Sequence, residues 1–258
     1  FGPVADALGG GVKVNFSNVL QESLGPNTYI LNDGTSSSIS SIEAIALSNF
    51  DDVLYNDENG NSFLRGGNDR AEFYTGHYVV PGSGSDTIVA HVDGVQVAYN
   101  DDGNDLAGNA TQGIRVTYEN GVAIVIDSWG DRDILTGVNE LLGSHLNDQF
   151  SGNDDVQLFH GGDGDDVIIS GSGDDTITGG EGSDTINGGA GLDSIILTET
   201  TSVTDTIEIS SVVGTSEGSG RTAVAGNDND TGEDIVTGFA VGTDVIKISA
   251  TEVVGFAH

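Results

Sequence analysis

Aspartate recurs every nine residues between Gly161 and Leu197. Four consecutive units, GGDGDDVII, SGSGDDTIT, GGEGSDTIN and GGAGLDSII, each place an aspartate at the sixth position: Asp166, Asp175, Asp184 and Asp193. Between Gly143 and Leu197 there are eleven acidic residues and no Lys or Arg. Carboxylates at this density must be kept apart or bridged by a cation, and hard oxygen ligands in flexible loops suit Ca²⁺ better than Zn²⁺ or Mg²⁺. The spacing therefore predicts calcium binding.

The same units contain the elements that must position these carboxylates. Glycines recur at positions 1, 2 and 4, where positive φ angles let a six-residue turn curl until its carbonyls and its aspartate face one point. The last three positions have β-branched character, with isoleucine always at the eighth: Ile168, Ile177, Ile186 and Ile195. A turn and a short strand repeated at a fixed period predict an all-β solenoid.

Burial alone cannot hold such a unit together. One buried aliphatic side chain contributes roughly 1.5–3 kcal/mol, whereas ordering the backbone costs on the order of 1–2 kcal/mol for each of nine residues. Metal binding is expected to supply the difference. The alternative interpretation, a disordered acidic linker, is disfavoured by the unbroken period with aliphatics in one column.

These units resemble the repeats-in-toxin (RTX) family, whose nonapeptide GGxGxDxUx forms a calcium-binding parallel β-roll. The resemblance implies that two nonapeptides make one coil, so that turns 18 residues apart share a Ca²⁺ ion and several ions bind. Backbone carbonyls would complete each shell. Gln157 stands where an aspartate is expected, so its site would be weak. The metal ligands implied are Asp148, Gly161, Gly162, Asp163, Gly164, Asp166, Gly171, Gly173, Asp175, Gly179, Glu181, Asp184, Gly188, Ala190, Asp193 and Asp86.

An internal duplication sets the expected domain organisation. IEAIALSNFDDVL from Ile42 aligns with VNELLGSHLNDQF from Val138. In the first copy, RGGNDRAEF from Arg65 is expected to place Arg70 in the aspartate column, and PGSGSDTIV restores the pattern with Asp86. We expect a degenerate first β-roll copy over residues 1–108, a second copy with regular nonapeptides over 109–197, and a C-terminal β capping segment over 198–258. Strong calcium sites should be concentrated in the second copy.

Composition limits the partners. The net charge is −34, with 7 Lys and Arg against 41 Asp and Glu, so a surface that binds nucleic acid or an anionic membrane is not expected. There is no cysteine, and hence no disulfide framework or thiolate metal site. No apolar run approaches about 18 residues, so no transmembrane segment is expected. The chain begins at Phe1, and we expect it to be a processed or excised piece of a longer protein.

Catalytic motifs are nearly absent, and no catalytic residue is expected. No HExxH string occurs, and the histidines show no ligand spacing. GTSEG around Ser216 matches G-x-S-x-G, but it lies in a Gly/Ser-rich loop without the strand-to-helix context of a nucleophile. Trp129 in SWGDRD is expected to pack on a strand end.

The leading hypothesis is a non-enzymatic calcium-binding structural module of a secreted bacterial RTX protein of the adhesin, surface-layer or matrix type. It would fold on meeting extracellular Ca²⁺, at the cell surface or beyond. Its expected partners are calcium and surface or matrix components or copies of itself, and the resemblance implies type I secretion, although no signal is recognisable at His258. The alternative is a Ca²⁺-dependent accessory domain of a secreted polysaccharide-modifying enzyme or protease. Ice binding would need a threonine ladder, which Val167 and Ser194 interrupt.

Overall fold

The computed structural model describes residues 10–15, 28–30, 36–38, 44–56, 60–100, 110–155, 157–197, 199–200, 203–209, 217–218, 221–224, 234–240 and 242–248. Within these ranges the regular structure consists of strands and contains no helix. No helical segment there has the length and apolar character needed to cross a membrane. The chain forms two compact units, which we call the first unit (residues 1–112 and 119–140) and the second unit (residues 113–118 and 141–258).

The first unit has two sheets. In one, parallel pairing joins β1 (Lys13–Asn15), β5 (Val53–Asn56), β7 (Arg70–Phe73), β9 (Thr87–Ala90) and β13 (Arg132–Thr136). Antiparallel strands flank this row: β2 (Thr28–Ile30) and β3 (Ser36–Ser38) beyond β1, and β12 (Val122–Ile126) beside β13. The other sheet is parallel and contains β4 (Ala44–Ala46), β6 (Gly60–Phe63), β8 (His77–Val80) and β10 (Val95–Ala98).

The register of the first unit corrects one prediction. β7 pairs Arg70 with Val53 on one side and with Thr87 on the other, so Asp69, rather than Arg70, aligns with Asp52 and Asp86. The repeat there starts at residue 64 because the two steps that bring Asp52, Asp69 and Asp86 into register have 17 residues each instead of 18. Its aliphatic position is therefore taken by Ala71, which is fully buried.

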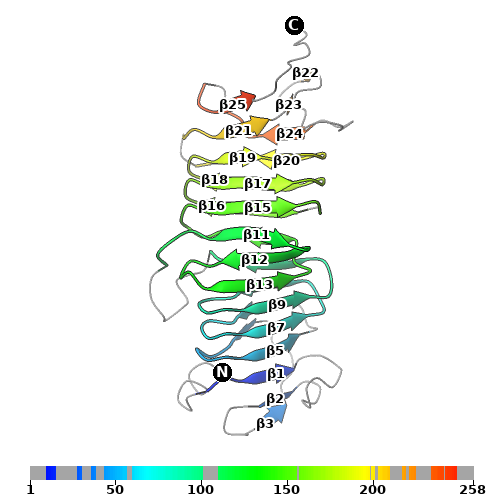
Figure 1. The fold of residues 1–258 in the computed structure, drawn as a ribbon, viewed down its shortest axis with the longest axis vertical. Helices are drawn as coiled ribbons and strands as arrows, with labels where there is room; N and C mark the ends of the chain where they lie inside the picture. The colour runs from blue at the N-terminus through cyan, green and yellow to red at the C-terminus, as the bar shows by residue number, and fades with distance from the viewer. Residues whose placement is uncertain are drawn as a thin grey trace. The chain divides into compact units, whose positions relative to one another are not determined.

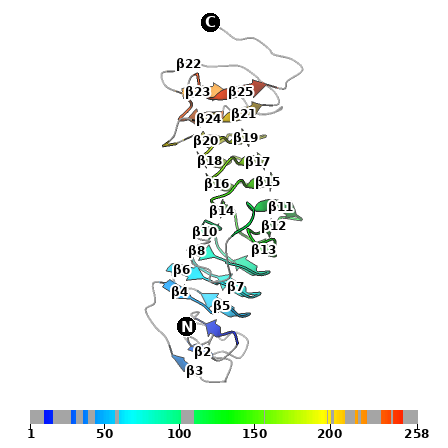
Figure 2. The same ribbon diagram turned by 90° about the vertical axis from the view of Figure 1, so that its left-hand side faces the viewer.

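The second unit is the regular roll. One sheet contains β11 (Arg115–Glu119), β15 (Gln149–Asn153), β17 (Val167–Gly171), β19 (Thr185–Asn187), β21 (Thr206–Ile209) and β25 (Val245–Ile248), all in parallel. The other contains β14 (Glu140–Leu142), β16 (Leu158–Asp163), β18 (Thr176–Glu181), β20 (Ser194–Ile196) and β24 (Asp234–Thr237). Figure 1 shows β15, β17 and β19 as successive rungs, and Figure 2 shows β16, β18 and β20 on the other face.

The core of the second unit lies between its two sheets. Two aliphatic and aromatic columns fill it, one from each sheet, and Phe150 packs on Phe159 with ring centroids 5.1 Å apart. Neighbouring residues in the same strands, such as Ile169, face outward because side chains alternate along a strand. The buried columns, each member at most 2% exposed, are Phe150, Ile168, Ile186 and Ile207, and Phe159, Ile177, Ile195 and Val236.

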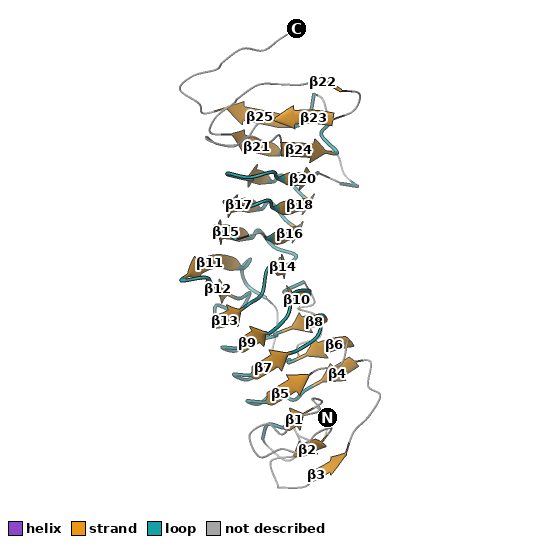
Figure 3. Cartoon of the chain, turned by 90° about the vertical axis from the view of Figure 1, so that its right-hand side faces the viewer, coloured by secondary structure: helices purple, strands orange, loops and turns teal. Residues whose placement is uncertain are grey.

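The roll continues beyond the regular repeats. β21, β24 and β25 keep parallel pairing after Leu197. Among the strands described after that residue, antiparallel pairing joins β22 (Glu217–Gly218) to β23 (Arg221–Val224) and β23 to β24. Figure 3 shows strands joined by loops through the described part of the chain. The predicted all-β parallel roll is confirmed, whereas the predicted boundaries at residues 108 and 197 stay a prediction.

Candidate metal centre

The turns of the second unit stack so closely that only glycine fits at their inner positions. Gly162 and Gly164, at positions 2 and 4 of their repeat, have φ angles of 113° and 114°. A Cβ at Gly180 would overlap the carbonyl oxygen of Gly162 in the preceding coil, and one at Gly182 would overlap that of Gly164. Backbone carbonyls of successive turns are thereby held side by side.

The glycine at position 1 makes room for the aspartate of its own turn. A Cβ at Gly161, Gly179 or Gly188 would overlap Oδ2 of Asp166, Asp184 or Asp193, respectively. Each Oδ2 therefore lies against bare backbone. The sequence shows only that glycine recurs at position 1. The structure shows that this glycine leaves room for Oδ2 of the aspartate in the same turn.

The aspartates form two hydrogen-bonded columns, one at each edge of the roll. The backbone N–H of each aspartate donates to Oδ1 of the aspartate in the next coil, and one oxygen of every carboxylate is thereby tied to the roll. One column has the bonds Asp148 to Asp166 (2.7 Å), Asp166 to Asp184 (2.9 Å), Asp184 to Asp205 (2.9 Å) and Asp205 to Asp244 (3.3 Å). The other has Gln157 to Asp175 (2.8 Å), Asp175 to Asp193 (3.0 Å) and Asp193 to Asp234 (3.0 Å).

The second oxygen of each central aspartate is buried without a hydrogen-bond partner. This holds for Oδ2 of Asp166, Asp175, Asp184 and Asp193, each in a side chain only 1% exposed. Burying an ionised carboxylate oxygen without a partner is strongly unfavourable. A hard cation between the turns removes that cost, and the donor set of carboxylates and carbonyls fits Ca²⁺.

Protonation also lowers the free-energy cost of burying a carboxylate, and the pKa values of these aspartates are raised accordingly. Burial raises the pKa of Asp166 to about 8 and the pKa values of Asp184 and Asp193 to about 7. Burial also raises the pKa of Asp175, and the hydrogen bond from the backbone N–H of Gln157 opposes the increase. Charges on neighbouring carboxylates add to the increase at Asp166, Asp184 and Asp193. These sites therefore hold either protons or a cation.

The two columns begin differently. Asp148 accepts at Oδ2 from the backbone N–H of Ser144 (2.6 Å) and at Oδ1 from the Ser144 hydroxyl (2.8 Å) and the N–H of Ile114 (2.6 Å). Both oxygens of Asp148 thus accept protein hydrogen bonds, whereas Oδ2 of Asp166 and of Asp184 accepts none. Gln157 lies in the aspartate column, as predicted, and its Oε1 is buried without a partner.

The remaining predicted ligands are spread along the same turns. Gly171 and Gly173 have the positive φ angles of positions 2 and 4, and the carbonyl of Ala190 accepts from the N–H of Gly173 at 2.8 Å. The side chain of Asp163 is exposed. Glu181 accepts from the N–H of Thr200 at 2.7 Å. Asp86 lies in the first unit.

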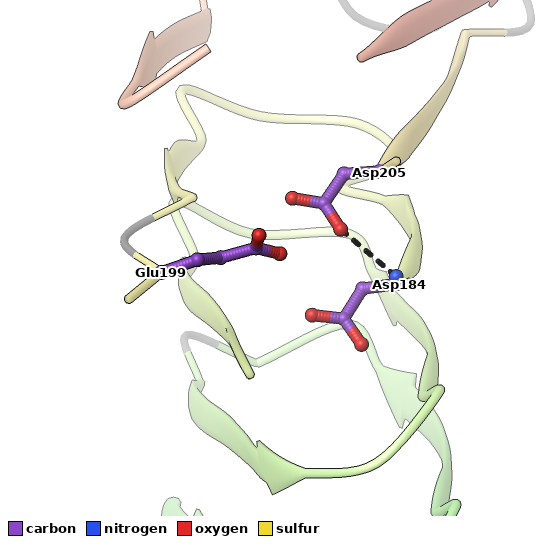
Figure 4. A group of neighbouring side chains, drawn as sticks. All are labelled: Asp184, Glu199 and Asp205. Atoms are coloured by element: carbon purple, nitrogen blue, oxygen red, sulfur yellow. Dashed lines mark hydrogen bonds between the residues drawn. The ribbon is translucent and has the colours of Figure 1, made fainter. Parts of the chain in front are cut away.

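Three carboxylates meet where the regular repeats end. Asp184, Glu199 and Asp205 each offer one oxygen, and these oxygens all lie within 4.8 Å of one another. Figure 4 shows Glu199 reaching toward the two aspartates from the segment after the last repeat. Burial, followed by the charge of Asp205, raises the pKa of Glu199 to about 7. This group has the ligand types of a calcium site.

Sequence reasoning missed four of these acidic residues. Asp205, Asp234 and Asp244 lie in the columns although they follow the last regular nonapeptide. The signal that could have found them is an aspartate followed two residues later by a buried or half-buried aliphatic: Ile207, Val236 and Ile246. Glu199 lies outside any repeat, and no sequence signal marks it.

The match to one protein-family model agrees with this geometry. A family model described as the RTX calcium-binding nonapeptide repeat, in four copies, matches residues 160–195. No match was found among curated proteins. Solved structures that match include the extracellular lipase LipA from Serratia marcescens, with a TM-score of 0.23 and 14% identity. That match covers 79% of this chain but 39% of the lipase chain. Residues 160–195 are thus RTX calcium-binding repeats, and these repeats bind Ca²⁺.

Proposed function

We propose that this chain is a non-enzymatic structural module of a secreted protein, and that its roll folds when it meets extracellular Ca²⁺. One observation carries the proposal: Oδ2 of Asp166, Asp175, Asp184 and Asp193 is buried without a partner inside RTX repeats. The proposed ligands are these oxygens and the backbone carbonyls of the stacked turns, together with Glu199 and Asp205 at the end of the repeats.

Calcium concentration would act as the folding switch. Without a cation, the buried carboxylates oppose folding, and a net charge of −34 adds self-repulsion in any compact state. A metal that binds the folded state alone contributes its binding free energy to folding. Extracellular calcium modules bind at about 10⁻⁴–10⁻³ M, so the chain would stay unfolded in a calcium-poor cytosol and fold outside.

The wider role is that of an extracellular or cell-surface scaffold of a bacterium. RTX repeats and the acidic composition support an adhesin, surface-layer or matrix module, with cell-surface components or copies of itself as partners and type I secretion as the export route.

Neither residue considered for another activity adds support for one. Trp129 belongs to a turn, where its backbone N–H donates to Oδ1 of Asp127 at 3.0 Å. Ser216 lies outside the described residues. The accessory-domain alternative stays a prediction and has no observation of its own in its favour.

The proposal is tested by a calcium titration of the chelator-treated chain, followed by far-UV circular dichroism. We expect a cooperative gain of β signal with Ca²⁺ and little gain with Mg²⁺ at the same concentration. The Mg²⁺ arm separates specific ligation from charge screening. A β spectrum and a thermal transition that EGTA leaves unchanged would overturn the proposal.

A further inference from the structure

The first unit contains an aspartate column of its own. The N–H of Asp52 donates to Oδ1 of Asp69 (2.7 Å), that of Asp69 to Oδ1 of Asp86 (2.7 Å), and that of Asp86 to Oδ1 of Asp133 (2.8 Å). All four side chains are at most 3% exposed. The bonding pattern is the one seen in the second unit, although these turns lie outside the matched residues 160–195.

Protein donors satisfy both ends of this column. Ser48 donates to Asp52 Oδ2 from its backbone N–H (2.7 Å) and from its hydroxyl (2.9 Å). At the other end, the hydroxyl of Tyr99 donates to Asp133 Oδ2 at 2.8 Å. The two middle members differ, because Oδ2 of Asp69 and Oδ2 of Asp86 are both buried without a partner.

The turns that carry these two aspartates stack as tightly as the turns of the second unit. A Cβ at Gly82 would overlap the carbonyl oxygen of Arg65, and a Cβ at Gly84 would overlap that of Gly67. These are positions 2 and 4 of successive turns, as at Gly180 and Gly182. Backbone carbonyls are thus stacked beside two unsatisfied carboxylates.

The charges that act most strongly on the pKa values of Asp69 and Asp86 are negative. Burial raises the pKa of Asp69 to about 9, and the charges of Asp52, Asp51 and Asp133 add to the increase. Arg70 does not neutralise the column, because its guanidinium pairs with Glu72 and donates to the Tyr55 hydroxyl at 2.7 Å. A cation of charge two would compensate the two carboxylates at once.

We propose that Asp69 and Asp86 hold a Ca²⁺ ion between the turns at residues 64–69 and 81–86. The site extends the proposed function and rests on it. It would lie on one edge only, since the described turns at the other edge, 74–76 and 91–94, contribute a single carboxylate, the exposed Asp93. The expectation that strong sites belong to the second copy depended on Arg70 occupying the column, which the register contradicts.

The test counts bound calcium on the full chain by equilibrium dialysis with radioactive Ca²⁺. Asp86→Asn and Asp69→Asn keep an oxygen that can accept the column hydrogen bond but remove the charge, so both variants should fold. Asp93→Asn is the matched control, with the same charge change at an exposed position. We expect each column variant to bind about one ion fewer than the wild type, and the control to bind the wild-type number.

The outcomes separate this inference from the proposed function. A wild-type calcium number in both column variants would overturn the site in the first unit and leave the second-unit sites intact. A wild-type chain that binds no calcium would overturn the proposed function itself. Circular dichroism at saturating Ca²⁺ checks that each variant folds.

Discussion

The backbone N–H of Asp166 donates a 2.9 Å hydrogen bond to Oδ1 of Asp184 in the next coil, while Oδ2 of Asp184 is buried without a partner. One carboxylate thus has two roles. Its first oxygen fixes the spacing of the coils, and its second is left for a cation. The structural role and the metal-binding role can therefore be separated by substitution.

Asp184→Asn should raise the calcium midpoint for folding about tenfold, the low end of what removing a supporting ligand costs at a metal site. Asparagine keeps an acceptor for the N–H of Asp166 but removes a charge from the group with Glu199 and Asp205. Asp93→Asn, at an exposed position outside the proposed ligand set, is the control with the same change in net charge. Calcium titrations followed by circular dichroism would give equal midpoints for both variants if Asp184 is not a ligand.

Gly180→Ala should destabilise the calcium-loaded roll more than Gly121→Ala. Both glycines have positive φ angles, 115° and 77°, so each substitution carries a backbone cost of about 1–2 kcal/mol. At Gly180 the new methyl group also overlaps the carbonyl of Gly162, whereas at Gly121 nothing lies within 4 Å. Urea unfolding at saturating Ca²⁺ measures the difference, and equal losses would contradict the close stacking of the turns.

Stability without calcium should fall as pH rises. Burial raises the pKa of Asp166 from 3.8 to about 8 in the folded state, so the folded chain binds this proton more tightly than the unfolded chain does. The resulting stability is fully present below about pH 3.8 and is lost as pH rises through about 8. In chelator, the β signal of the folded roll should therefore be larger near pH 5.5 than near pH 8.5, and this dependence should weaken in Asp166→Asn. A β signal that stays constant or rises from pH 5.5 to pH 8.5 would contradict the protonation of the column.

Most of the second unit could be predicted because its period is unbroken. With nine residues per turn and strand, the aspartate and isoleucine columns follow by counting, and the columns at Asp166 and Ile168 lie where counting places them. The close fit between Gly161 and Asp166 Oδ2 is a three-dimensional consequence of the same repeat.

Prediction failed where the coil length changes. In the first unit, two coils have one residue fewer than in the second unit. Counting by nine therefore assigned Arg70 to the aspartate column, whereas the strand register places Asp69 there. No residue in the sequence marks this shift. In the second unit the spacing after Asp184 and Asp193 grows to 21 and 41 residues. Counting therefore lost Asp205 and Asp234, because an insertion in a loop leaves the strand register intact but destroys the period.

Hydrogen–deuterium exchange of the full chain, with Ca²⁺ and with EGTA, tests most directly the claim that calcium folds this roll. The amides of Asp148, Asp166, Asp175 and Asp184 are hydrogen-bonded to the next carboxylate in their columns, so they exchange slowly only when the coils are stacked. We predict strong protection of peptides across residues 148–197 in Ca²⁺ and loss of that protection in EGTA near neutral pH. Equal protection in both conditions would contradict the account.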